Sequence, residues 1–355
     1  MIKILELFGG IGSPRKALIN LGVDHKCIDY VEIDEKAVRT YNALFDNNYS
    51  PQSVIDYNLR PDFLVHGSPC QDFSRAGKRL GGNDEDKTRS SLVFETLKII
   101  ENLGKWKPKF VIWENVKGVL DKDMIHSFNK YLLEMEKLGY TNFFKILNSM
   151  DFGIPQRRER LYTVSILGGG VEFSFDNLEK VPLKPISNFL EDNIRDTKYI
   201  VKQPSMVKYL PTNSFNKKYG GNLRVIEDFC WTITTKQVRH PNSGIVKIDE
   251  NTYRYLTERE CWRFMGFSDE DFDKASLEHK TKDGKLNGTL YKQAGNSIVV
   301  QVLEAIFKEL LKLNVTGTAQ GGLNRENLLN IQIPLPPIDI QQKIVSEIEV
   351  LEAKE

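Results

Sequence analysis

Cysteine, histidine and long apolar runs are all scarce in this sequence, and each shortage excludes a class of protein. The 355 residues contain 4 cysteines and 5 histidines, and no two cysteines form a Cys-x-x-Cys pair. This argues against a zinc site or a disulfide framework and favours a reducing cytoplasm. No stretch approaches the roughly 18 apolar residues of a membrane span, and the N-terminus reads as a strand, not as a signal peptide. We therefore expect a cytoplasmic protein with no metal site and no membrane contact.

Charge of one sign is not in excess either. The formal net charge is +1, so it neither supports nor excludes a nucleic-acid partner, which would need basic residues gathered on one face. Apolar content of 40% and charged content of 27% are ordinary for a soluble globular protein. The length allows one large domain with an insertion, or two domains.

Segments of strand and helix character alternate over the first 166 residues. Such alternation predicts an α/β fold with a doubly wound, mostly parallel sheet. The expected strands are residues 2–7, 27–33, 63–66, 110–114, 143–147 and 161–166, and the expected helices are 17–21, 36–45, 92–103 and 125–138.

The alternation stops at three consecutive glycines, residues 168–170. The chain that follows is rich in asparagine, lysine and proline, which indicates an inserted small domain. Helical patterns resume near Thr257, and residues 296–313 read as one strongly amphipathic helix. We expect a first domain at 1–169, an inserted domain at 170–253, a return to the first domain at 254–313 and a tail at 314–355.

The loop Gly-Ser-Pro-Cys-Gln-Asp-Phe-Ser at 67–74 directly follows the expected strand 63–66. Pro69 restricts the backbone and presents Cys70 at the carboxyl end of a strand, where open α/β sheets bind ligands. Because the thiolate is the reactive form of cysteine, Cys70 is a candidate nucleophile. The alternative is a small buried apolar side chain.

A glycine-rich turn, Phe8-Gly9-Gly10-Ile11-Gly12, joins the first expected strand to a helix. Glycines there let the backbone approach a ligand at the positive end of a helix. Glu32 ends the second expected strand, where a carboxylate can accept both hydroxyl groups of a ribose. The pair suggests an adenosine-type cofactor, against the alternatives of a plain tight turn and a solvated acid.

Two further segments carry charged groups at strand ends. Glu114 ends an apolar strand, so its surroundings should raise its pKa and favour a protonated carboxyl that can donate a hydrogen bond. Arg158 and Arg160 stand at alternate positions of an extended segment, so they can clamp one anionic or polar group together. Taken alone, the carboxyl could be an ordinary strand-end acid and the arginines a solvated face.

Six motifs occur in a fixed order along the chain. They are Phe-x-Gly-x-Gly, Ser-Pro-Cys-Gln-x-Phe-Ser, Glu-Asn-Val, Gln-Arg-Arg-Glu-Arg, Leu-Thr-x-Arg-Glu and Gln-Ala-Gly-Asn-Ser. Together they resemble a bacterial DNA (cytosine-5)-methyltransferase over residues 2–311. The resemblance implies a Rossmann-like methyltransferase sheet, S-adenosyl-L-methionine as cofactor and double-stranded DNA as partner. It also implies that residues 170–253 form a target-recognition domain, and that the protein guards DNA against a cognate restriction enzyme or belongs to a mobile element.

The resemblance assigns the reaction to four residues. Cys70 would add to C6 of cytosine, and Glu114 would hydrogen-bond N3 and the exocyclic amine. Arg158 and Arg160 would hold the base and help to keep the thiolate ionised. For the cofactor, Phe8 would stack on the adenine and Glu32 would bind the ribose. The full cofactor set is Phe8, Gly10, Ile11, Gly12, Glu32, Ile33, Asp56, Tyr57, Pro69, Leu92, Asn296 and Ile298.

The target base must leave the duplex stack to be reached. Residues 71–89, which are rich in glycine and basic side chains, suit a loop that closes over the DNA backbone, against the alternative of a solvated surface loop. In the inserted domain, basic residues such as Arg224 and His240 could face a groove. The expected DNA contacts are Gln71, Ser74, Arg75, Lys78, Arg89, Lys236 and Arg239.

The tail departs from this family. Residues 321–345, with Ile-Pro-Leu-Pro-Pro at 333–337, resemble part of a type I restriction specificity subunit. We expect a docking element for a partner or a second copy, a cap that packs on the protein itself, or a relic of gene fusion.

Three other functions compete with DNA methylation. The same chemistry could methylate cytosine in RNA, although the long insertion favours DNA. A catalytically silent DNA-binding or assembly protein would not need the complete set of site residues. A dinucleotide oxidoreductase would explain the glycine turn but not Cys70 or the arginines.

Overall fold

A computed structural model describes residues 1–54, 61–67, 92–122, 124–170, 172–211, 223–237 and 241–315. Its centre is a six-stranded sheet in the order β2-β1-β3-β4-β7-β5. The first four of these strands run parallel to one another, while β7 is antiparallel to both β4 and β5. The predicted α/β fold with a mostly parallel sheet is therefore confirmed. The strands are β1 (Ile2–Leu7), β2 (His25–Val31), β3 (Phe63–His66), β4 (Phe110–Val116), β5 (Tyr140–Asn148) and β7 (Glu159–Leu167).

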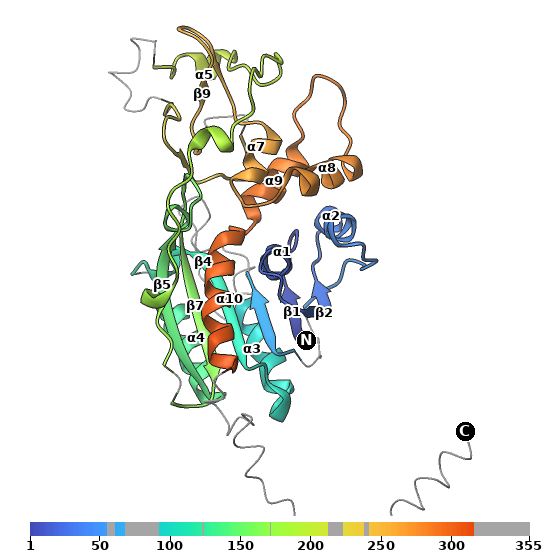
Figure 1. Cartoon of the computed structure of the whole chain (residues 1–355), viewed down its shortest axis with the longest axis vertical. Coiled ribbons are helices and arrows are strands. Elements are labelled where there is room, and N and C mark those ends of the chain that lie inside the picture. Colours follow the sequence, from blue (N-terminus) through green and yellow to red (C-terminus); the bar gives the residue numbers. More distant parts are fainter. Residues whose placement is uncertain are drawn as a thin grey trace, which may run out of the picture.

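Helices cover both faces of the sheet, which is why the central strands read as continuous apolar runs. All four residues of β3 and the first four of β4 are buried. One face forms a core with α1 and α10, and the opposite face forms a second core with α3 and α4. Figure 1 shows α10 lying in front of the sheet and α4 behind it. The helices that flank the sheet are α1 (Ser13–Asn20), α2 (Glu35–Phe45), α3 (Leu92–Asn102), α4 (Ile125–Lys137) and α10 (Val300–Val315).

The last described helix, α10, packs against the first helix, α1. The ring of Phe307 meets the ring of Phe63 edge-on, with centroids 5.5 Å apart. Phe307 and Ile4 of β1 belong to the same core. The end of the described chain is thus built into the same layer as its beginning.

The single helix predicted for 296–313 is wrong at its start. Helix α9 (Gly288–Asn296) ends at Asn296, Ser297 is extended with ψ 154°, and α10 begins at Val300. The Ser297 hydroxyl donates to the Gln293 carbonyl at 2.8 Å, and the Ser297 carbonyl accepts a hydrogen bond from Arg158. The helix break is therefore associated with hydrogen bonds of Ser297, which the spacing of apolar residues does not predict.

Part of the inserted region, between Val201 and Tyr255, forms a small separate core above the sheet, at the top of Figure 1. Its strand β8 pairs in parallel with β6, just before β7, so that Gln156 lies opposite Cys230 and Arg157 opposite Trp231. The strand β6 is Gln156–Arg157, and the short elements of the inserted region are α5 (Pro204–Val207), β8 (Cys230–Trp231), β9 (Val246–Lys247) and β10 (Tyr253–Arg254). The chain then returns through α7 (Glu258–Arg263) and α8 (Asp269–Glu278) to α9. Single 3-10 turns are η3 (Gly104–Trp106), η4 (Lys117–Leu120), η5 (Ser149–Asp151), η6 (Phe175–Asn177) and η7 (Ile186–Asn188).

A buried ion pair fixes the point where the inserted region meets α7. The guanidinium of Arg254 donates to both carboxylate oxygens of Glu260, at 2.7 and 2.8 Å. The two side chains are only 3% and 0% exposed. Glu260 also accepts from the Thr257 amide, while Thr257 accepts from the Glu260 amide, which is a reciprocal helix cap. The carboxylate thus serves both the ion pair and the first turn of α7.

In the part of the chain that the structure describes, no helix is long and apolar enough to cross a membrane.

We predict that Glu260→Gln lowers the free energy of unfolding by about 3 to 5 kcal/mol, because it leaves the buried Arg254 charge without its partner. Urea denaturation measures the change, with the same dependence of the unfolding free energy on urea concentration used for both proteins. The control is Glu270→Gln, since Glu270 is 82% exposed and lies 3.9 Å from Lys274; it should change stability little. Equal stabilities of the two variants would contradict a structural role for the pair.

Candidate active site

The carboxyl ends of β1, β3 and β4 meet at a small cavity of about 50 Å³. The turn after β1, the segment from Val65 to Gly67, and Glu114 line it, together with residues that follow α9. The cavity brings together six of the predicted site residues, namely Phe8, Gly10, Ile11, Glu114, Asn296 and Ile298. These residues come from three distant stretches of the chain, so the fold assembles the site at the edge of the sheet where such folds bind ligands.

The glycine turn after β1 adopts a left-handed backbone at alternate residues. Phe8, Gly10 and Gly12 have φ values of 53°, 55° and 81°. A Cβ atom on Gly12 would lie 2.4 Å from the Phe45 ring, whereas one on Gly10 would meet no atom within 4 Å. Gly12 is thus required for close packing, and Gly10 leaves open space in which a ligand can approach the backbone.

Glu32 is held in place by backbone amides. It follows β2, and one carboxylate oxygen accepts from the Gly10 amide at 3.1 Å. The other oxygen accepts from the amides of Ile33 and Asp34 at 2.8 and 2.9 Å. The Ile33 side chain beside it is 74% exposed. A fixed carboxylate next to an uncovered apolar surface is an arrangement that suits a ribose and its attached base.

Glu114 is a nearly buried carboxyl group at the end of β4. Burial raises its pKa, and the positive charges of Arg160 and then Arg158 oppose that rise without cancelling it. Arg160 Nε lies 3.3 Å from Glu114 Oε1. The predicted direction of the pKa shift is confirmed, and its cause is the desolvation expected for a carboxyl in an apolar strand.

Arg158 and Arg160 differ in their hydrogen-bond and ion-pair partners, although the positive charges of both act on Glu114; that they hold one ligand group together stays a prediction. Arg158 is buried and donates to the carbonyls of Ile233, Gly295 and Ser297 at 2.9, 3.1 and 3.0 Å. Arg160, in contrast, reaches Glu114. The segment is not uniformly extended, since the Arg158 amide donates to the Gln156 carbonyl and β7 begins only at Glu159. The two side chains therefore have different partners, and Arg158 serves to hold segments together.

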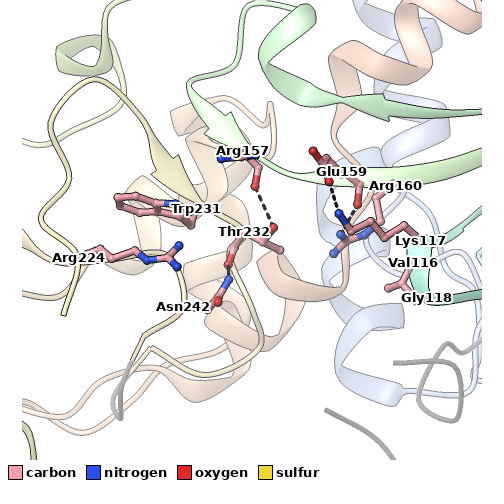
Figure 2. A pocket seen from close by; sticks show the side chains of 10 residues that line it. All are labelled: Val116, Lys117, Gly118, Arg157, Glu159, Arg160, Arg224, Trp231, Thr232 and Asn242. Carbon is pink, nitrogen blue, oxygen red and sulfur yellow. Dashed lines mark hydrogen bonds and ion pairs between the residues drawn. The ribbon is translucent and has the colours of Figure 1, made fainter. Parts of the chain in front are cut away.

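A second, larger cavity of about 440 Å³ lies beside the first and is strongly basic. Figure 2 shows its lining, which contains four cationic residues, Lys117, Arg157, Arg160 and Arg224, and one acidic residue, Glu159. The full lining is Val116, Lys117, Gly118, Arg157, Glu159, Arg160, Arg224, Trp231, Thr232 and Asn242. We call this cavity the basic cleft. It gives the segregated positive charge that a nucleic-acid partner requires.

Several residues of the basic cleft were not predicted from the sequence. Lys117 directly follows the Glu-Asn-Val motif, and Arg157 is the second residue of Gln-Arg-Arg-Glu-Arg, so their positions beside motif residues were a usable signal. Trp231 and Asn242 carry no such signal, because only the packing of the inserted region brings them to the cleft.

The remaining predicted residues fall into two groups. Lys236 is exposed and lines a third cavity of about 480 Å³ together with Asn296, and Leu92 begins α3 without lining the first cavity. The others lie outside the described residues, and they are Asp56, Tyr57, Pro69, Cys70, Gln71, Ser74, Arg75, Lys78, Arg89 and Arg239. Gly67, which lines the first cavity, precedes Cys70 by only three positions.

A further buried carboxyl group, Glu6, lines the first cavity and was not predicted. Tyr41 donates its hydroxyl to Glu6 Oε1 at 2.7 Å, and the Cys27 thiol lies 3.6 Å from the same oxygen. Burial raises the pKa of Glu6 to about 7, although the Tyr41 hydrogen bond opposes the shift. An acidic residue within the apolar strand Ile2–Leu7 was the signal in the sequence.

Comparison with known proteins gives two family matches. The family described as C-5 cytosine-specific DNA methylase matches residues 2–312. The Type I restriction modification DNA specificity domain matches residues 285–355, so its match overlaps the end of the first and continues through the tail.

Individual relatives match nearly the whole chain. The Type II methyltransferase M2.ScrFI of Lactococcus lactis subsp. cremoris is 34% identical over 88% of this chain and 99% of its own length. The orphan methyltransferase M.SPRI of Bacillus phage SPR is 29% identical over 87% of this chain and 97% of its own length. Among solved structures, the Dnmt2 methyltransferase of S. pombe has a TM-score of 0.69 at 22% identity, covering 88% of this chain and 99% of that one. This last likeness shows the fold alone.

We predict that Glu6 makes stability depend on pH. Its pKa is raised in the folded protein from 4.5 to about 7, so the folded state binds the proton more tightly. The resulting stability is present below pH 4.5 and is lost as the pH rises through 7, by at most about 3 kcal/mol. Urea denaturation at pH 5 and pH 8 should show a smaller loss in Glu6→Gln than in the parent protein. The control variant Glu134→Gln should lose as much stability between pH 5 and pH 8 as the parent protein. An equal loss in all three proteins would refute the attribution of this pH dependence to Glu6.

Proposed function

The chain belongs to the C-5 cytosine-specific DNA methylase family and is a DNA (cytosine-5)-methyltransferase, and we propose that it methylates cytosine in one short duplex sequence through an adduct at Cys70. The observation that carries this proposal is the first cavity, in which Glu114, Gly10 and Gly67 meet. The resemblance of the catalytic part to this family, and of the tail to a type I specificity subunit, is confirmed by the two family matches.

Cytosine C5 is a poor nucleophile while the ring is aromatic, and addition of Cys70 to the ring removes that aromaticity. Its thiolate forms a bond to C6, and the displaced electron pair makes C5 nucleophilic. S-adenosylmethionine, when bound, provides an electrophilic methyl group. After C5 is methylated, loss of the C5 proton restores the ring double bond and expels the thiolate. Support comes from the chain itself, because Gly67 in the cavity wall is three residues from Cys70.

Glu114 acts on the opposite side of the cytosine ring from C5 and C6. A carboxyl whose pKa is raised by burial is able to donate a hydrogen bond to N3, which withdraws electrons from the ring as the thiolate adds. Arg160 Nε, 3.3 Å from Glu114 Oε1, orients that carboxyl and offers donors to the base. Arg158 is a positioning residue, since its guanidinium binds backbone carbonyls.

The residues around the glycine turn fit S-adenosylmethionine. Phe8 and the exposed Ile33 offer apolar surfaces for the adenine, and the open space beside Gly10 accepts a ligand against the backbone. Among the described residues Glu32 Oε2 accepts only from the Gly10 amide, so this oxygen keeps an acceptor lone pair for a ribose hydroxyl. The further residues proposed to hold this cofactor are Ile11, Gly12, Asp56, Tyr57, Pro69, Leu92, Asn296 and Ile298.

Duplex DNA would lie in the basic cleft, with the target base turned out of the stack toward Glu114. Extrusion costs a few kcal/mol, and phosphate contacts from cleft residues such as Lys117 and Arg157 help to offset that cost. Relatives named Type II methyltransferase, and an orphan methyltransferase of a phage, support a role in a restriction-modification system or on a mobile element. The partners would be a cognate restriction enzyme and, through the tail, a further protein or a second copy.

We predict that plasmid DNA from cells expressing the protein carries 5-methylcytosine at one short recurring sequence. Base-resolution sequencing should show that Cys70→Ala abolishes the modification and Glu114→Gln reduces it strongly. Cys261→Ala, which removes a thiol that lines neither cavity, should retain it. Unmodified DNA from a soluble protein that still binds S-adenosylmethionine would overturn the proposed reaction.

We further predict that deleting residues 316–355 leaves methylation largely unchanged, because the family match ends at residue 312. Transfer of a labelled methyl group to DNA measures this in the full chain and the truncated one. A truncated protein that folds normally but has no activity would show that the tail belongs to the catalytic machinery.

A further inference from the structure

We propose that Arg224 reads a guanine of the recognition sequence, at a fixed position relative to the target cytosine, and that Trp231 holds the Arg224 guanidinium in the orientation for reading. This inference rests on the proposed function, because it requires duplex DNA in the basic cleft. It goes beyond that function in naming a base of the recognition sequence and the side chain that selects it.

Arg224 is an exposed side chain whose donors point into the basic cleft. Its Cζ atom lies over the Trp231 ring, 4.9 Å from the centroid, which is a cation–π contact. Figure 2 shows the two side chains together at one end of the cleft. Among the described residues, no carboxylate pairs with Arg224, whereas Lys117 pairs with Glu159 and Arg160 with Glu114.

The contact with tryptophan suits the reading of a base. A guanidinium reads guanine through two parallel hydrogen bonds to O6 and N7 in the major groove, and this requires a fixed plane. An aromatic ring beneath the guanidinium supplies that plane by a cation–π contact. It also lowers the entropy that a long side chain loses on binding.

The backbone that carries Arg224 and Trp231 is built as one rigid unit. The Ile245 amide donates to the Arg224 carbonyl at 2.8 Å, and the Trp231 amide donates to the Ser243 carbonyl at 3.1 Å. Gly244 lies between them with φ +100°, and a Cβ there would come within 2.9 Å of the Arg224 carbonyl oxygen and 3.3 Å of the Trp231 ring. Only glycine allows the three segments to pack so closely.

This unit is attached to the segment that leads into β7 of the six-stranded sheet. Trp231 pairs with Arg157 through β8 and β6, and the Thr232 hydroxyl donates to the Arg157 carbonyl at 2.9 Å. The next carbonyl, that of Ile233, accepts from Arg158. The distance from Arg224 to Glu114 is therefore set by short, ordered connections. A base read by Arg224 must lie at one fixed offset from the base that enters the first cavity.

The test is base-resolution sequencing of 5-methylcytosine in DNA from cells that express the full-length protein or its variants. The parent sequence motif should contain an invariant guanine near the methylated cytosine. Arg224→Ala should keep the other positions of the motif but relax this one, with a loss of discrimination of about 10- to 100-fold. Arg224→Lys should discriminate at this position less well than the parent protein and better than Arg224→Ala, because lysine keeps the charge but lacks the planar fork.

Lys208→Ala is the matched control. Lys208 is also an exposed cation of the inserted region lying over an aromatic ring, 4.9 Å from the centroid of Tyr209, but it does not line the basic cleft. Its removal should leave the motif unchanged.

A second measurement covers the case in which Arg224→Ala methylates too little DNA to define a motif. Oligonucleotide duplexes carrying 7-deazaguanine in place of each guanine in turn lack the N7 acceptor at that position. The parent enzyme should lose about 10-fold in methylation rate at one position only. Residual activity of Arg224→Ala should be insensitive to the same replacement.

A motif that stays unchanged while methylation falls at all sites would mean that Arg224 contacts a phosphate, and it would overturn this inference while the proposed function stands. A motif without any invariant guanine would overturn it as well. Absence of methylation by the parent enzyme would instead overturn the proposed function, so the two failures are distinguishable.

Discussion

The rest of the structure depends on the hydrogen bonds of one buried guanidinium, that of Arg158. It binds the carbonyl of Ile233 in the inserted region, the carbonyl of Gly295 in the last turn of α9 and the carbonyl of Ser297 just after that helix. A buried charge is costly unless its donors are satisfied, and these three acceptors offset that cost only when all three segments are in place. The position of the inserted region relative to the sheet is thereby fixed.

Gln156 completes the same junction. Its amide nitrogen donates to the Phe264 carbonyl at 2.8 Å, and its amide oxygen accepts from the Ile233 amide at 3.0 Å. The alternate residues Arg157 and Glu159 face the basic cleft instead. One short motif therefore serves two purposes, since its inward side chains join the parts of the protein and its outward ones line the basic cleft.

The two cavities have opposite electrostatic character although they adjoin. The small one contains two carboxyl groups, Glu6 and Glu114, and burial raises the pKa of both. The basic cleft has an excess of positive charge. Arg160 lines the cleft and also contacts Glu114, so it stands at the boundary. A negatively charged nucleic-acid backbone is thus attracted to the cleft, while the neighbouring cavity favours neutral or positively charged groups.

The sequence by itself determined the sheet, the glycine turn, the family and the candidate nucleophile. The sheet and the turn depend on neighbours along the chain, because strand and helix periodicity and turn geometry are local properties. The family follows from the resemblance carried by six motifs in a fixed order. Only the tertiary structure decided the partners of Arg158, the helix break at Ser297 and the contact of Arg224 with Trp231. The carbonyls that Arg158 binds lie 75 to 139 positions away. Long polar side chains take whatever acceptor the packing of distant segments brings near, and no local pattern contains that information.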